Sequence, residues 1–114
     1  MFALYILKDR KPVPVDEPEW AQWFGAHHDE RVVGRWDFAG TEVSTVFLGC
    51  DHQFRDDGPP LLFETMVFGP RGTPHLVKRY STWAEAEDGH MNTCTVEKAR
   101  VRTPGWPSAS SRCG

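Results

Sequence analysis

The chain lacks the features that mark membrane and secreted proteins. None of its apolar runs approaches the roughly 20 residues that a membrane-spanning helix needs, and no basic segment precedes the apolar start FALYIL. Its three cysteines, Cys50, Cys94 and Cys113, form no C-x-x-C pair, and an odd number fits reduced thiols better than a disulfide framework. We therefore expect a cytoplasmic protein with no membrane partner.

Positive charge is also in short supply. Thirteen Lys and Arg stand against sixteen Asp and Glu, which gives a formal net charge of −3. A surface that binds DNA or RNA neutralises phosphates with clustered Lys and Arg, so we do not expect nucleic acid as a partner. Without a basic field, the tryptophans and phenylalanines are better explained as core residues than as a platform for stacking bases.

The chain does have enough apolar material for one domain. Hydrophobic residues make up 39% of the 114 residues and charged residues 25%, and five Trp and seven Phe supply large side chains. A chain of this length buries roughly two thirds of its surface on folding, so a core can form without metal or disulfides. We predict a single domain over residues 1–102 and a flexible tail, rich in Pro and Ser, over residues 103–114.

The first 30 residues predict a hairpin and a helix. Residues 2–7 and 13–15 are strand-like, and the second strand, with Pro12 and Pro14, must lie at an edge. From Glu17, large side chains recur at i, i+3, i+4 and i+7, which predicts an amphipathic helix. Its predicted buried stripe consists of Trp20, Trp23, Phe24 and His27.

Four further runs, separated by Gly- and Pro-rich turns, predict strands because they are rich in Val, Phe, Thr and Trp. They span residues 31–38, 43–48, 61–68 and 75–80. Thr82 and Glu85 then form a capping box for a second helix. Its predicted buried stripe consists of Trp83, Ala86, His90, Met91 and Cys94. We predict an α+β fold, with a four- to five-stranded, mainly antiparallel meander and two helices packed on one face.

One block of sequence points to a family. Between Glu42 and Gly69 the chain carries the segments STVFLG, DH and GPPLLFETM, and RYSTW follows downstream. These segments resemble a group of small uncharacterised proteins encoded by bacteriophages and prophages, and the resemblance covers most of residues 2–100. It implies work inside an infected or lysogenic bacterial cell. We therefore expect a non-enzymatic accessory protein that binds a host protein, for example to inhibit a host defence system.

An up-and-down order of the strands would bring three polar segments to one end of the sheet. They are residues 27–30, the loop 50–57 and the start of the second helix at 79–82. The candidate ligand-binding residues at that end are His28, Asp51, His52, Asp57, Arg79, Tyr80 and Ser81. His75 would lie at the opposite end, a strand of roughly 20 Å away, so it could not share a metal with His52.

Several interpretations of this end compete. Imidazole and carboxylate groups could bind a metal, although the chain has no H-x-x-x-H or H-E-x-x-H motif, and we expect no cofactor. The simpler interpretation is that Asp51, Asp56 and Asp57 accept hydrogen bonds from turn amides. The segment 79–82 could bind an anion at the helix N-terminus, or could form only a capped helix.

Two residues invite a catalytic role. Cys50 is next to Asp51 and His52, but a neighbouring carboxylate disfavours the thiolate, so we do not expect a nucleophile there. Glu64 is the only acid inside a strongly apolar run. We expect it to face solvent or to pair with Arg79 on the neighbouring strand.

The sheet face away from the helices predicts a partner. Its apolar positions are Val46, Leu48, Met66 and Phe68. An uncovered face of that composition would be too apolar for water, which predicts a homodimer or a protein partner. Trp106, in the tail, could anchor such a contact.

Two alternatives of a different class stay open at this point. One is a small ligand- or metal-binding protein or enzyme that uses the end of the sheet around Asp51, His52 and Arg79. The other is a minor virion or assembly component.

Overall fold

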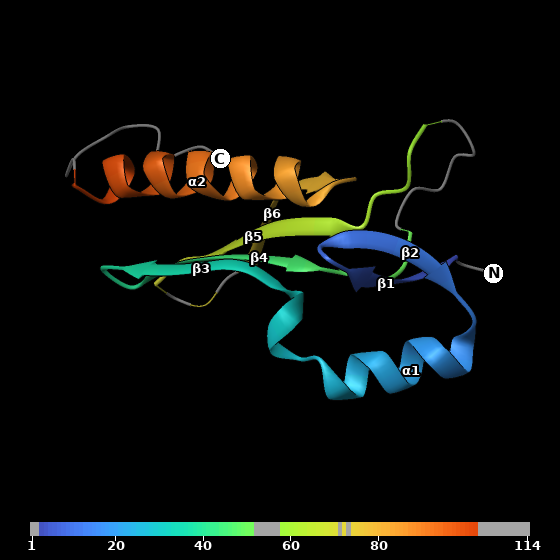
Figure 1. Ribbon diagram of the computed structural model, residues 1–114. Helices are drawn as coiled ribbons and strands as arrows, with labels where there is room; N and C mark the ends of the chain where they lie inside the picture. Colours follow the sequence, from blue (N-terminus) through green and yellow to red (C-terminus); the bar gives the residue numbers. More distant parts are fainter. Residues whose placement is uncertain (1–2, 52–57, 71, 73, 103–114) are drawn as a thin grey trace.

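The fold is known from a computed structural model, in which residues 3–51, 58–70, 72 and 74–102 are described (Figure 1). His52, Asp57 and Trp106 therefore lie outside the described residues. The elements are β1 (Leu4–Lys8), β2 (Lys11–Val15), α1 (Glu17–Ala26), the short 3₁₀ helix η1 (Asp29–Arg31), β3 (Val32–Phe38), β4 (Thr41–Phe47), β5 (Phe63–Phe68), β6 (Pro74–Tyr80) and α2 (Trp83–Arg102).

The predicted opening hairpin is confirmed. β1 and β2 pair antiparallel through a tight turn in which Asp9 and Arg10 both have positive φ. Among the described residues β2 pairs only with β1, so its two prolines do lie at an edge. The amide of Tyr5 donates to the carbonyl of Gly49 at 2.8 Å, which joins the hairpin to the segment that follows β4.

The predicted meander is also confirmed. The four-stranded sheet has the order β3-β4-β5-β6, and every neighbouring pair is antiparallel. Both outer strands carry a bulge, because Val33 in β3 and Val77 in β6 have no opposite residue in the register. A bulge bends a strand and redirects its side chains.

The two helices pack as an α+β fold requires. α2 crosses one face of the four-stranded sheet and contacts all four strands (Figure 1). α1 packs beside β1, and its Trp23 and Phe24 rings lie 6.0 and 6.1 Å from the ring of Phe47. Phe47 projects from the same face as Thr45, which contacts α2. The predicted fold class is confirmed.

The core lies where the hairpin, α1, the sheet and the first turns of α2 meet. The buried apolar cluster comprises Ile6, Leu7, Trp23, Phe47, Leu62, Phe63, Tyr80 and Ala86. Aromatic rings dominate this cluster: Phe63 lies 5.2 Å from Phe47 and 6.1 Å from Trp83 between ring centroids. No helix of the described residues is long and apolar enough to cross a membrane.

One prediction about α2 is wrong. Met91 is 63% exposed, whereas Thr93 and Glu97 are buried. Side chains four, seven and eleven residues after Ala86 share its face, and Met91 lies about 100° from its neighbour His90 on the helix. Thr93 can be buried because its hydroxyl donates to the carbonyl of Gly89 at 2.8 Å. The prediction left Thr93 out of the buried stripe because it is polar, and included Met91 because it is hydrophobic.

Candidate functional site

The loop end of the sheet is held by ordinary structural hydrogen bonds. Asp51 Oδ1 accepts from the amide of Leu61 at 3.0 Å and so closes the base of the loop. The predicted role of Asp51 in bonding a turn amide is thereby confirmed. His28 lies in an exposed turn, where its Nδ1 is 2.9 Å from the Arg31 guanidinium. Within the described ranges, no group of three or more His, Cys, Asp and Glu side chains is placed to hold a metal ion.

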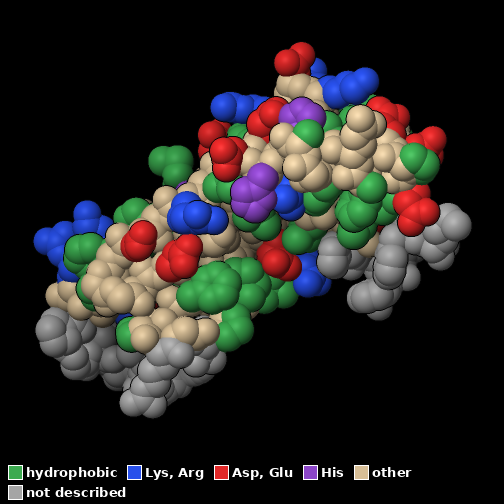
Figure 2. Space-filling model, turned by 90° about the horizontal axis from the view of Figure 1, so that it is seen from below, with side chains coloured by type: hydrophobic (Ala, Val, Ile, Leu, Met, Phe, Trp, Pro, Cys, Tyr) green, Lys and Arg blue, Asp and Glu red, His purple; other side chains and the backbone are tan. Residues whose placement is uncertain are grey.

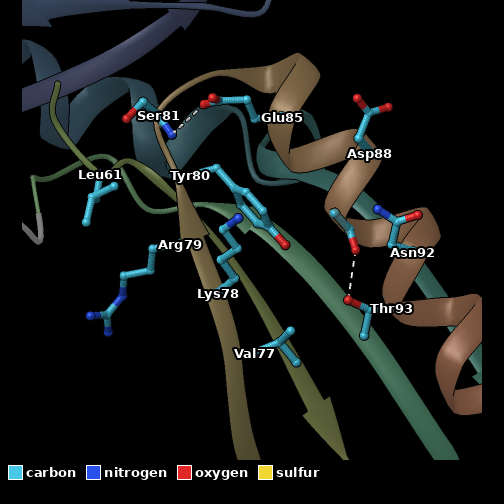
Figure 3. Close-up of a pocket in the computed structure, with 11 residues that line it drawn as sticks. Leu61, Val77, Lys78, Arg79, Tyr80, Ser81, Glu85, Asp88, Asn92 and Thr93 are labelled. Atoms are coloured by element: carbon cyan, nitrogen blue, oxygen red, sulfur yellow. Dashed lines mark hydrogen bonds between the residues drawn. The ribbon is translucent and has the colours of Figure 1, made fainter.

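The side chains of Arg79 and Tyr80 point to opposite faces of the sheet, although both residues line the hollow between β6 and α2 described below. Arg79 Nε donates to Glu64 Oε1 at 3.1 Å on the face away from α2, which confirms the predicted pair. Tyr80 points toward α2, and its hydroxyl donates to Thr65 Oγ1 at 3.0 Å (Figure 3).

The N-terminus of α2 already has its own anion. The amides of Ser81 and Thr82 both donate to Glu85 Oε1 at 3.2 Å, and the amide of Glu85 donates to Thr82 Oγ1 at 3.1 Å. This is the reciprocal arrangement of a capping box. It confirms the capped-helix interpretation, because a carboxylate of the chain occupies the place that a bound anion would take.

Neither described cysteine is an activated nucleophile. Burial raises the pKa of the Cys50 thiol, and the charge of Asp51 raises it further. Burial also raises the pKa of the Cys94 thiol. Both groups are therefore protonated thiols at neutral pH, and it is the thiolate that attacks or ligates. The predicted effect of Asp51 on its neighbour is confirmed.

The face away from α2 is more polar than its apolar positions alone predict. Val46, Met66 and Phe68 lie on it and are half-buried. The ion pairs Arg35–Glu42 at 3.4 Å and Arg79–Glu64 at 3.1 Å lie on the same face. Figure 2 shows this side, with acidic and basic side chains beside the hydrophobic ones. Leu48 follows β4 and is half-buried, and its amide donates to the carbonyl of Leu62 at 2.7 Å.

Two neighbouring hollows lie between the outer strand β6 and α2, and we call them together the β6–α2 groove (Figure 3). Its upper section, nearer the start of α2, has a volume of about 470 Å³ and is lined by Leu61, Val77, Lys78, Arg79, Tyr80, Ser81, Glu85, Asp88, Gly89, Asn92 and Thr93. Its lower section, of about 230 Å³, is lined by His75, Val77, Asn92, Thr93, Val96, Glu97 and Arg100. Val77, Asn92 and Thr93 line both sections.

The bulge in β6 builds the strand wall of this groove. Lys78 lies opposite Thr65 and Leu76 lies opposite Met66, which leaves Val77 as the extra residue. In a regular strand, neighbours such as Val77 and Lys78 would point to opposite faces. Here both line the groove, and Figure 3 shows both side chains on the side of α2.

The groove exposes apolar side chains from both of its walls. Val77 is 41% exposed on β6, and Val96 is 55% exposed on α2. They are two of the four large hydrophobic residues that are exposed within the described part of the chain. The other two, Leu76 and Met91, do not line the groove.

The walls of the groove also differ in charge. Lys78 on the strand wall forms no ion pair among the described residues, and its ammonium lies 5.9 Å from the centroid of the Tyr80 ring. Asp88 on the helix wall likewise forms no ion pair within the described ranges. A cation and an anion thus face the same hollow without neutralising each other by contact.

A chain of hydrogen bonds runs from Tyr80, which lines the groove, across the sheet to α2. The Tyr80 hydroxyl donates to Thr65 Oγ1, which is 2.6 Å from Thr45 Oγ1. Thr45 Oγ1 is in turn 2.7 Å from His90 Nδ1, and His90 Nε2 is 3.5 Å from Cys94 Sγ. The chain links β6, β5 and β4 to α2 and so fixes the position of the helix over the sheet.

The donors in the middle of this chain depend on the tautomer of His90. Either threonine hydroxyl can donate in the Thr45–Thr65 bond, because each hydroxyl oxygen can also accept two hydrogen bonds. When the His90 proton is on Nε2, Nδ1 accepts from Thr45 Oγ1. Burial lowers the pKa of His90, which favours the neutral ring.

Glycines make room for the two rings in this chain. A Cβ on Gly34 of β3 would lie 2.6 Å from the His90 ring. A Cβ on Gly89 of α2 would overlap the ring and hydroxyl of Tyr80. The close approach of helix and sheet thus depends on one glycine from each.

No family model, curated protein or solved structure matches this chain. The resemblance to phage and prophage proteins therefore stays a prediction. Val77, Asp88 and Val96, which line the groove, were not among the predicted site residues. The bulge that turns Val77 and Lys78 to one side of β6 cannot be predicted from the sequence HLVKRY.

Proposed function

We propose that this protein is a non-enzymatic binding protein of phage or prophage origin that acts on a protein of the bacterial host. The observation that carries the proposal is the β6–α2 groove, where Val77 and Val96 leave apolar surface in contact with water on two facing walls. Exposed apolar surface with a polar rim is typical of protein interaction sites. Inhibition of a host defence system is the form of this activity that the resemblance favours.

The state of the reactive side chains supports binding rather than chemistry. Asp51 closes a loop, Glu64 pairs with Arg79, and Glu85 caps a helix. Each of these carboxylates has a structural task. His90 is half-buried between α2 and the sheet, with both ring nitrogens engaged.

The test is capture of host proteins by the tagged full-length chain, with cross-linking and quantitative mass spectrometry. We would compare the wild type with Val77→Glu and Val96→Glu, which place a charge on either wall of the groove. Met91→Glu is the matched control, because Met91 is an equally apolar, 63% exposed residue of the same helix outside the groove. Substitutions at such exposed positions should leave the fold intact.

We expect at least one host protein to be enriched by the wild type and by Met91→Glu and depleted about tenfold or more by both groove variants, a loss of about 1.4 kcal/mol. A host protein recovered equally by all four chains would place the contact elsewhere, with the face of Val46, Met66 and Phe68 as the next candidate. Recovery of no host protein by any chain would contradict the proposed function.

A further inference from the structure

We infer that the β6–α2 groove binds a second copy of this chain, in a two-fold symmetric dimer that brings the strand wall of each copy against the helix wall of the other. The inference goes beyond the proposed function, which concerns a host protein. It follows from three features of the groove: the exposed side chains at its rim, the balance of its charges, and the placement of complementary groups on opposite walls.

The side chains that a second copy can reach stand at the rim of the groove. Its floor consists of buried lining residues, which are Tyr80, Thr93 and Glu97. Val77 and Val96 are 41% and 55% exposed, and Lys78 and Asp88 are exposed as well. A second copy can therefore contact these four side chains at the rim without entering the hollow.

The charges of the groove favour a copy of the same chain. Its two sections are lined by three basic residues, Lys78, Arg79 and Arg100, and by three acidic residues, Glu85, Asp88 and Glu97. With His counted as neutral, the groove has a net charge of zero, from three basic and three acidic residues, although the whole chain carries −3. Identical surfaces with a net charge repel each other, whereas this groove can meet its own copy without net repulsion.

The charges of the upper section complement each other across a dimer. Lys78 lies on the strand wall and Asp88 on the helix wall, and neither is in an ion pair among the described residues. A two-fold axis that runs along the groove, between the two copies, places each strand wall opposite the helix wall of the other copy. Lys78 of each copy then faces Asp88 of the other, and the symmetry forms this contact twice.

The same axis matches the apolar residues of the lower section. Val77 on the strand wall and Val96 on the helix wall line this section together. Rotation about an axis along the groove leaves each residue at its own level, so the lower sections of the two copies meet. Val77 of each copy therefore faces Val96 of the other, which removes apolar surface from water on both walls of both copies. One symmetry operation satisfies both sections.

The size of this contact sets the expected affinity. Each copy contributes part of one strand and part of one helix face, which places the dimer among small protein interfaces, with less than about 1,200 Å² buried in total. Small interfaces of this kind are reversible. We expect a dissociation constant in the micromolar range, about 1–100 μM.

The experiment is sedimentation equilibrium of the purified full-length chain between about 1 and 500 μM, which spans this range of dissociation constants. Reducing conditions exclude dimers that are linked by disulfides. We expect a reversible monomer–dimer equilibrium for the wild type. Val77→Glu and Val96→Glu should each weaken the dimer by about tenfold or more, and Met91→Glu should leave its affinity unchanged.

Charge reversal tests which walls meet. Lys78→Glu brings two acids together at both contacts and Asp88→Lys brings two bases together, so each variant alone should dimerise about tenfold or more weakly than the wild type. An equimolar mixture of the two variants should regain the wild-type affinity, because opposite charges meet at both contacts of the mixed dimer. Lys98→Glu is the control, because it makes the same change of charge at an exposed position of α2 outside the groove.

Three results would overturn the inference. The first is a wild type that stays monomeric over the whole concentration range. The second is a dimer whose affinity is the same in Val77→Glu and Val96→Glu, which would place the contact on another surface. The third is a pair of charge variants whose affinity is not restored by mixing, or which are weakened no more than Lys98→Glu.

The inference and the proposed function can fail separately, because ultracentrifugation of the purified chain needs no host protein. If the chain stays monomeric but capture of a host protein depends on Val77 and Val96, only the inference is wrong. If mixing restores the dimer but no host protein is captured, the groove is a dimer interface and the proposed function is wrong. If both results are positive, the host protein and the second copy compete for the same walls.

Discussion

Substitution of Gly89 by Ala should destabilise this protein, against the usual effect of that change in a helix. Alanine is normally the better helix residue by about 1 kcal/mol, because glycine loses more backbone freedom on folding. Gly89 lies inside α2, six positions after the helix begins at Trp83. A Cβ at this position would overlap the ring and the hydroxyl of Tyr80, which is 5% exposed and packed in the core.

The magnitude follows from the contacts that must move. Overpacking of a tight core site costs about 1–3 kcal/mol. Displacement of the Tyr80 hydroxyl from Thr65 adds about 1 kcal/mol for the lost hydrogen bond. Set against the gain of about 1 kcal/mol in helix propensity, the net loss in the free energy of unfolding should be about 1–3 kcal/mol.

Urea unfolding of four variants checks this reasoning: Gly89→Ala, Gly25→Ala, Tyr80→Phe and the double variant of Tyr80→Phe with Gly89→Ala. Gly25→Ala in α1 is the matched control, because a Cβ there meets nothing within 4 Å, so it should stabilise the protein by up to about 1 kcal/mol. Tyr80→Phe removes the hydroxyl that a Cβ on Gly89 would overlap. In that background Gly89→Ala should therefore cost at least about 0.5 kcal/mol less. Equal or greater stability of Gly89→Ala compared with the wild type would refute the packing described here.

Three further predictions concern stability. Burial lowers the pKa of His90 below its usual 6.5, so the unfolded chain binds that proton more readily than the folded one. The free energy of unfolding should therefore fall as the pH drops below about 6.5 and level off below the folded-state pKa. In His90→Gln this part of the pH dependence should be absent from urea midpoints measured between pH 5 and 8. Thr45→Val should cost about 1–3 kcal/mol in urea unfolding, since it removes the hydroxyl that Thr65 Oγ1 and His90 Nδ1 both contact; a loss below about 0.5 kcal/mol would contradict a stabilising role for this hydroxyl. Thr82→Ala should lower the melting temperature through a loss of about 1 kcal/mol, because it removes the cap of α2; Ser81→Ala is its control, because Ser81 joins the capping box through its backbone amide, and equal losses would exclude this capping role.

Most of the fold could be predicted from the sequence, because local signals and tertiary packing agree in this chain. The β-branched and aromatic residues of β4 predict a strand, and every second side chain from Thr41 to Phe47 is buried. The capping box of Thr82 and Glu85 marks the start of α2 within one residue. Prolines placed β2 at an edge. These signals are local, and the short turns left few other ways to join the strands.

The candidate site was much harder to predict, because it depends on register. The sequence grouped Arg79 and Tyr80 as neighbours, yet strand alternation sends one to Glu64 and the other toward α2. It also placed Met91 in the core and left Thr93 outside, because hydrophobicity alone cannot show which side of a helix faces a sheet. The buried pair of Thr45 and Thr65 could have been predicted, since both lie on the inner faces of neighbouring predicted strands.

The two glycines between α2 and the sheet have a consequence for how this chain can change over evolutionary time. The His90 ring occupies the space that a side chain at position 34 would need, and the Tyr80 ring does the same at position 89. Each glycine and its ring can therefore change only together. A descendant that acquires a side chain at position 89 would have to shrink position 80 in the same lineage. That shrinkage would widen the β6–α2 groove at its upper end and so alter which surfaces it fits. Drift in the interior of this protein would thereby be a route to a new partner.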